Sequence, residues 1–204
     1  MIGLVTRTPL AMVAGMQGPK SVKELIEASK AKPGSINYGS GGSGSISHIV
    51  AEAFTRKAGI EMTHIPYKGN AAALTDVAGG SIQILFDGLT AASALEGKVR
   101  ILALADDKRH PDHPNVPTFA EAGLPGYEAY TWNCLFAPAG TPQPIIAKLN
   151  AALNQALTSP TVLQIAARSG GKVIGPSTPA EASAFAVKER AQWVPFVKAM
   201  QIAN

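Results

Sequence analysis

The sequence predicts an α/β fold in which helices flank a parallel or mixed sheet. Short apolar segments alternate with amphipathic helical segments over the first half of the chain. The segment 99–105, VRILALA, is almost continuously apolar, as in a strand that is buried on both faces. Helical patterns dominate after residue 140, so we expect a soft domain boundary at 130–140.

Each element follows from a local pattern. The segment 1–18 has a short apolar run interrupted by Pro9, which favours a strand over a signal peptide. Ser21 and Glu24 form a capping box for a helix at 22–31, and apolar spacing predicts a helix from Ile46 to just before Gly59. The other expected strands are 36–38, 62–67, 82–86, 99–105, 127–137 and 172–174. The other expected helices are 70–77 (capped by Asn70), 91–96, 119–122, 144–157, 161–168 and 179–200.

Composition excludes several classes of protein. Of the 204 residues, 46% are hydrophobic and 16% are charged, which excludes a disordered chain. No run approaches the roughly 20 apolar residues of a membrane span. The single cysteine, Cys134, excludes an internal disulfide and a multi-cysteine metal site, and the scattered basic residues give no nucleic-acid face. We therefore expect no nucleic-acid partner, no metal and no cofactor.

A glycine-rich loop between a strand and a helix is the clearest candidate site. Gly39, Gly41 and Gly44 match the dinucleotide fingerprint, but the next strand ends in Pro66-Tyr67-Lys68 and lacks the acid that would bind a ribose. Serine hydroxyls add donors to the loop, a surface that suits a carboxylate. A carboxylate site, a nucleotide-binding module and a flexible connection all remain open at this point.

An acyl hydrolase that uses a serine and a histidine is the enzymatic alternative. Serines stand near His48, and Asp87 is available as a third group. The nucleophile elbow Gly-x-Ser-x-Gly is absent, because Ser45 stands where its last glycine is required. His48 lies in the first turn of its helix, where it either donates a neutral N–H to a ligand or caps and packs. The acyl hydrolase remains open as the enzymatic alternative at this point.

Five motifs, taken in order, resemble one protein family. They are INYGS with the glycine loop and His48, then HIPYKG (64–69), LFDG (85–88), VPTFAEAG (116–123) and FAPAGTP (136–142). Together they resemble the Bug (Bordetella uptake gene) or TctC family of solute-binding proteins, which serve tripartite tricarboxylate transporters. The resemblance implies a periplasmic protein with a periplasmic-binding-protein-like fold of type II. Its partners would be a small mono- or dicarboxylate, held between two α/β domains, and the membrane components of the transporter. The resemblance thus implies a protein that is not an enzyme.

The resemblance also implies which residues line the site. In the family, the glycine loop holds a ligand carboxylate through N–H groups and hydroxyls. Lys68 either attracts the anion or is solvated, Asp87 either accepts from the ligand or caps the next turn, and Trp132 forms either a cleft wall or core. The predicted ligand-binding residues are Ser40, Gly41, Gly42, Ser43, Gly44, Ser45, His48, Tyr67, Lys68, Gly69, Asp87, Gly88 and Trp132.

Family members carry a signal sequence and most of a first domain ahead of the point where this chain starts. We therefore expect residues 14–130 to form the family's second domain, and 1–13 with 131–204 to form an incomplete first domain. The low charged fraction agrees with apolar surface that has lost its cover on the helix containing Ile145, Leu149, Leu153 and Leu157. Such surface favours self-association.

Overall fold

The computed structural model describes residues 1–95 and 97–200, and the chain divides into two compact units. The larger unit is Pro9–Tyr130. The smaller unit joins Met1–Thr8 to the segment that begins at Thr131. The chain therefore passes between the units within its first strand and again at Tyr130.

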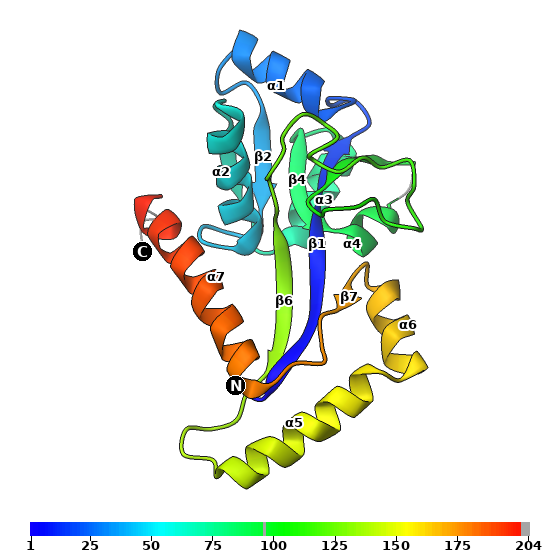
Figure 1. Ribbon diagram of the computed structural model, residues 1–204. Helices are drawn as coiled ribbons and strands as arrows, with labels where there is room; N and C mark the ends of the chain where they lie inside the picture. The colour runs from blue at the N-terminus through cyan, green and yellow to red at the C-terminus, as the bar shows by residue number, and fades with distance from the viewer. Residues whose placement is uncertain (96, 201–204) are drawn as a thin grey trace. The chain divides into compact units, whose positions relative to one another are not determined.

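A mixed sheet forms the centre of the larger unit (Figure 1). Its strands lie in the order β3-β2-β4-β1-β5. β2 runs parallel to β3 and β4, whereas β1 runs antiparallel to β4 and β5, so the sheet is mixed rather than mainly parallel. The bounds are β1 Gly3–Gly15, β2 Asn37–Ser40, β3 Thr63–Pro66, β4 Ile84–Gly88 and β5 Val99–Leu104.

The helices of this unit begin and end at residues that satisfy their free backbone groups. Ser21 caps α1 and Ser45 caps α2, each accepting a hydrogen bond from the N–H group three residues later. Gly59 ends α2 in the left-handed conformation. The bounds are α1 Val22–Ala31, α2 Ile46–Ala58, α3 Asn70–Gly79 and α4 Leu89–Ser93.

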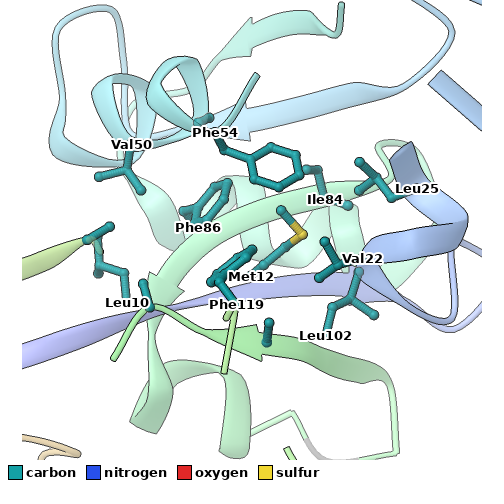
Figure 2. Packing of buried hydrophobic residues seen from close by; sticks show 14 of the residues in the cluster. Leu10, Met12, Val22, Leu25, Val50, Phe54, Ile84, Phe86, Leu102 and Phe119 are labelled. Carbon is teal, nitrogen blue, oxygen red and sulfur yellow. The ribbon is translucent and has the colours of Figure 1, made fainter. Parts of the chain in front are cut away.

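The alternation of side chains along β1 builds a hydrophobic core on each face of the sheet. Leu10 and Met12 point into the first core, together with residues of α1 and α2, while Ala11 and Val13 point into the second with residues of α3 and α4. Figure 2 shows the first core, where aromatic rings pack around Met12. Four of its rings contact one another: Phe54, Phe86, Phe119 and Tyr127.

The smaller unit surrounds the first residues of β1. Thr6 pairs with Val173 in an antiparallel ladder, and β6 also pairs with β1. The Asn150 amide donates to the carbonyl oxygens of Ile2 and Ser177, at 2.7 Å in each case. The bounds are α5 Gln143–Leu157, α6 Pro160–Arg168, α7 Pro179–Ala199, β6 Tyr130–Leu135 and β7 Lys172–Val173. In the described part of the chain, no helix combines the length and apolar character of a membrane span.

The structure corrects one predicted element and leaves another partly open. Residues 119–122 form turns rather than a helix. Glu121 and Thr118 exchange the hydrogen bonds of a capping box, but Gly123 adopts a positive φ directly afterwards and the chain turns away after one turn. The predicted helix 91–96 is α4, shifted to Leu89–Ser93, and its expected end at Glu96 lies outside the described residues.

Candidate functional site

The candidate site lies where three parallel strands end at the same edge of the sheet. β2 is parallel to both β3 and β4, so the segments that follow these strands meet at their carboxyl ends. The three segments are the glycine loop at residues 40–45, residues 67–70, and the last two residues of β4, 87–88. Most of the residues that the sequence predicts for ligand binding belong to this edge.

Steric demands within the protein explain the glycine pattern. A Cβ at Gly41 would lie 2.9 Å from Asn70 Oδ1, so the neighbouring loop leaves no room for a side chain there. Gly44 has φ +78°, in the left-handed region that favours glycine. The match to a dinucleotide fingerprint therefore requires no nucleotide to account for it.

Several N–H groups of the glycine loop are bonded within the protein. Gly41 donates to Ser47 Oγ at 3.0 Å, Gly42 to Ser40 Oγ at 3.1 Å and Gly44 to His48 Nδ1 at 3.1 Å. By contrast, the N–H groups of Ser43, Ile46 and Ser47 have no hydrogen-bond partner among the described residues. The donors that remain for a ligand thus centre on the start of α2.

The serines of the loop have separate roles. Ser40 is completely buried, and its hydroxyl contacts the Gly42 carbonyl oxygen at 3.1 Å and His64 Nε2 at 2.6 Å, so this hydroxyl supports the loop. Ser45 caps α2. Ser43 is exposed, and within the described residues its hydroxyl has no partner. Of the serines predicted to bind a ligand, Ser43 is the one that presents its hydroxyl to solvent.

Asn70 links the first turn of α2, the start of α3 and β4 beside the glycine loop, a role that the sequence did not reveal. Asn70 Oδ1 accepts from Ser47 Oγ at 2.8 Å, and its amide nitrogen donates to the Phe86 carbonyl oxygen at 3.3 Å. The prediction that Asn70 caps α3 is wrong, because Gly69 occupies the cap position and no side chain caps this helix. Its side chain instead turns toward the glycine loop and β4.

Two histidines stack beneath the glycine loop. The rings of His48 and His64 lie 3.8 Å apart between centroids, with 6° between their planes. Burial lowers the pKa of both rings, that of His64 to about 4, where a charge on His48 lowers it further. Both are therefore neutral at pH 7. The neutral His48 accepts the Gly44 N–H through Nδ1, so its proton is on Nε2.

The remaining predicted residues occupy varied places. Tyr67 donates to Asp76 Oδ2 at 2.7 Å, and burial followed by this bond raises the pKa of Tyr67 to about 12. Lys68 is exposed, and Gly69 has φ +108°. Asp87 Oδ1 accepts from the N–H of Gly88 at 2.8 Å; Gly88 occupies the cap position of α4, and no side chain caps this helix.

Trp132 differs from the other predicted residues because it belongs to the smaller unit. It packs edge-on against Phe185 of α7, with ring centroids 5.3 Å apart. Trp132 is half-buried, and this contact is compatible with both roles predicted for it. Cys134, two residues further along β6, has its pKa raised by burial, which makes its thiol a poor nucleophile.

The geometry does not favour hydrolysis. Ser40 and His64 form a serine–histidine contact, but Ser40 is completely buried, so an acyl carbon has no path to its hydroxyl. His48 Nδ1 is already occupied by the Gly44 N–H. Within residues 1–95 and 97–200, no group of three or more metal-ligating side chains is present. The site is better suited to bind an anion than to react with one.

Comparison with known protein sequences gives one consistent answer. The family model described as the tripartite tricarboxylate transporter family receptor (TctC) matches residues 1–202. BugT of Bordetella pertussis is 32% identical over 203 residues, which are 97% of this chain and 61% of BugT. A UPF0065 protein of Cupriavidus necator, from the gbd 5′ region, is 36% identical over 142 residues, 69% of this chain and 43% of that protein. The chain thus spans about half the length of the curated relatives that it matches.

Solved structures of binding proteins share this fold. Rpa4515 of R. palustris with adipate has a TM-score of 0.86 and 33% identity, over 99% of this chain and 68% of that one. MatC (Rpa3494) from Rhodopseudomonas palustris with bound malate has a TM-score of 0.82 and 32% identity, over 96% of this chain and 68% of that one. The periplasmic binding protein BugD has a TM-score of 0.80 and 32% identity, over 98% of this chain and 69% of that one. These matches confirm the predicted periplasmic-binding-protein fold class.

Proposed function

The chain belongs to the tripartite tricarboxylate transporter receptor family, as its motifs indicated, and from this membership we propose that it recognises a small mono- or dicarboxylate outside the cytoplasm. Two structural neighbours hold adipate and malate, and both of these ligands belong to the proposed class. Its partners would be the membrane components of a tripartite tricarboxylate-type transporter. In this role the protein binds and delivers its ligand without changing it chemically.

The observation that carries the proposal is the set of free donors at the start of α2. The N–H groups of Ser43, Ile46 and Ser47 have no partner among the described residues, and the exposed hydroxyl of Ser43 adds another donor. α2 has 13 residues, so its dipole favours an anion at this end by about 0.3 to 2 kcal/mol. A carboxylate supplies lone pairs and no donors, which is the complement of this surface.

The charge around the loop agrees with an anionic ligand. The loop itself, residues 40–45, contains no acidic side chain, and exposed Lys68 follows the neighbouring strand. Asp87 already uses one carboxylate oxygen on the Gly88 N–H, so it offers the other to a ligand hydroxyl or bridging water.

Calorimetry with a matched pair of variants tests the proposal. Adipate, malate, benzoate and glutamate would be titrated into the chain, with uncharged adipamide as the control ligand. Ser43→Asp places a negative charge among the free donors, whereas Ser21→Asp places the same charge at the start of α1 and keeps a capping side chain there. We expect at least tenfold weaker carboxylate binding for Ser43→Asp, and a change below about twofold for Ser21→Asp. Failure of every carboxylate to bind, or equal binding by Ser43→Asp, would overturn the proposal.

A further inference from the structure

The glycine loop is held at two points by the stacked histidines. His48 Nδ1 accepts from the Gly44 N–H at 3.1 Å. His64 Nε2 contacts Ser40 Oγ at 2.6 Å, and the same oxygen accepts from the Gly42 N–H at 3.1 Å. The conformation of the loop therefore depends on one pair of rings, in addition to the bonds from the Gly41 N–H to Ser47 Oγ and from the Ser45 N–H to the Gly42 carbonyl oxygen.

The rings are fixed from the side of the sheet. Tyr38 of β2 stacks on His64 with centroids 5.0 Å apart, and its phenol donates to Glu52 Oε1 at 2.6 Å. The titratable groups that face the pair are Tyr38 from β2 and Glu52 from α2, besides the two histidines themselves. The Glu52 carboxylate favours a positive charge on the rings, but burial outweighs it and lowers the pKa of both histidines.

Protonation affects the two rings differently. A protonated His48 carries hydrogens on both nitrogens, so Nδ1–H and the Gly44 N–H would be two donors that face each other across 3.1 Å. That bond is then lost. His64 Nε2 can donate to Ser40 Oγ in either protonation state, so its contact survives. The loop is therefore sensitive to the proton on His48, while His64 holds the His48 ring in place.

We propose that His48 is a positioning residue: its neutral ring, stacked on His64, fixes the glycine loop, and its protonation releases the loop and weakens carboxylate binding. Release of the loop depends only on the hydrogen bonds described above. The weakening of binding rests on the proposed function. The two consequences are tested by separate measurements.

The first measurement needs no ligand. Nuclear magnetic resonance of the ¹⁵N-labelled chain would follow the Gly42 and Gly44 amides and the His48 ring nitrogens between about pH 8 and pH 4.5. We expect both amides to shift, and Gly44 to lose hydrogen-exchange protection, at the midpoint at which His48 gains its second proton. His48→Ala should lack Gly44 protection at every pH. The proposal would be overturned if the Gly44 amide signal does not change as His48 gains its second proton, or if the amide signals of the loop stay constant down to pH 4.5.

The conservative variant His48→Asn separates positioning from a general effect on folding. Asparagine Oδ1 offers an acceptor near the place of Nδ1 but does not titrate in this range. We expect His48→Asn to regain much of the Gly44 protection that His48→Ala loses, and to keep it at low pH. Circular dichroism would show that all variants are folded. Protection that is equally absent in both variants would count against the hydrogen bond as the cause.

The second measurement compares affinity for adipate at about pH 8 and pH 5 within each variant. Protonation of adipate itself weakens binding equally in both proteins, and this shared factor is first divided out. From pH 8 to pH 5 we then expect the Kd of the parent chain to rise about tenfold or more, and the Kd of His48→Asn to change by less than about threefold. Tighter binding by the parent at low pH would mean that the imidazolium contacts the carboxylate, and would overturn the proposal. If the loop titrates as expected but adipate never binds, the proposed function fails and the positioning role of His48 stands.

Discussion

Replacing Asn70 by alanine should loosen the whole sheet edge that carries the candidate site. The Asn70 side chain makes two hydrogen bonds, one from Ser47 Oγ at 2.8 Å and one to the Phe86 carbonyl oxygen at 3.3 Å. These bonds link the first turn of α2, the start of α3 and β4, next to the glycine loop. Alanine removes both bonds and leaves a buried hydroxyl and a buried carbonyl oxygen with one partner fewer.

The size of the effect follows from these two bonds. A hydrogen bond inside a protein contributes about 0.5 to 1.5 kcal/mol net, so the loss of two should lower the free energy of unfolding by about 1 to 3 kcal/mol. Alanine has the higher helix propensity, which returns a few tenths of a kcal/mol at the first residue of α3. We therefore expect a net destabilisation of about 2 kcal/mol, which raises the unfolding equilibrium constant roughly 30-fold.

Hydrogen exchange gives this value for the larger unit alone. Amides of β2 and β4 that exchange by global opening would be compared between the parent, Asn70→Ala and Asn115→Ala, the last being an exposed asparagine in a loop of the same unit. Asn115→Ala should change the free energy of opening by less than about 0.5 kcal/mol. If Asn70→Ala is equally mild, Asn70 does not hold the three segments together and the reasoning is wrong.

Three further predictions concern the loop, the pH and the surface. Gly44→Ala should lower the free energy of unfolding by about 1 to 2 kcal/mol, because the φ of +78° at this residue disfavours a side chain. Urea unfolding should show little loss for the control Gly79→Ala, where a Cβ meets nothing within 4 Å, and equal losses for the two variants would contradict this reasoning. The pKa of His64 falls from 6.5 in the unfolded chain to about 4 in the fold, so the unfolded state takes up the proton first and the free energy of unfolding should fall from pH 6.5 to pH 4. Urea titrations should show a smaller fall for His64→Gln, and an equal fall would refute the role of His64 in this pH dependence. Ile145 and Leu149 are exposed on one face of α5, so sedimentation velocity should show self-association of the parent chain. The double variant Ile145→Lys with Leu149→Lys should self-associate less, and the control Ala151→Lys with Gln155→Lys should self-associate as much as the parent; a monodisperse parent monomer would contradict the role of this surface.

The apolar surface of α5 is smaller than its sequence suggested. Ile145 and Leu149 are exposed, but Leu153 is half-buried and Leu157 is buried. The spacing of the four residues places them along one stripe of a helix, and the spacing alone does not tell which turns of that stripe meet the rest of the unit. The packing of the smaller unit made that distinction.

Local signals accounted for most of the elements. α1 begins and ends where predicted, at Val22 and Ala31, and α2 runs from Ile46 to Ala58 as its apolar spacing and Gly59 indicated. Such features act over a few residues, because a cap or a left-handed glycine satisfies backbone groups within one turn. The strands were found with bounds that differ by at most three residues, since strand ends depend on partners elsewhere in the chain.

What the sequence by itself determined is the fold class, the family and the position of the glycine loop between β2 and α2, because periodicity, caps and motif order are written in consecutive residues. Only the tertiary structure decided which loop groups face outward. The orientations of the Ser40, His64 and Asn70 side chains depend on hydrogen bonds to residues 23 or 24 positions away and on burial. A polar side chain that leaves water must find a partner wherever the fold provides one, and the identity of that partner is a property of the packed sheet edge rather than of the local sequence.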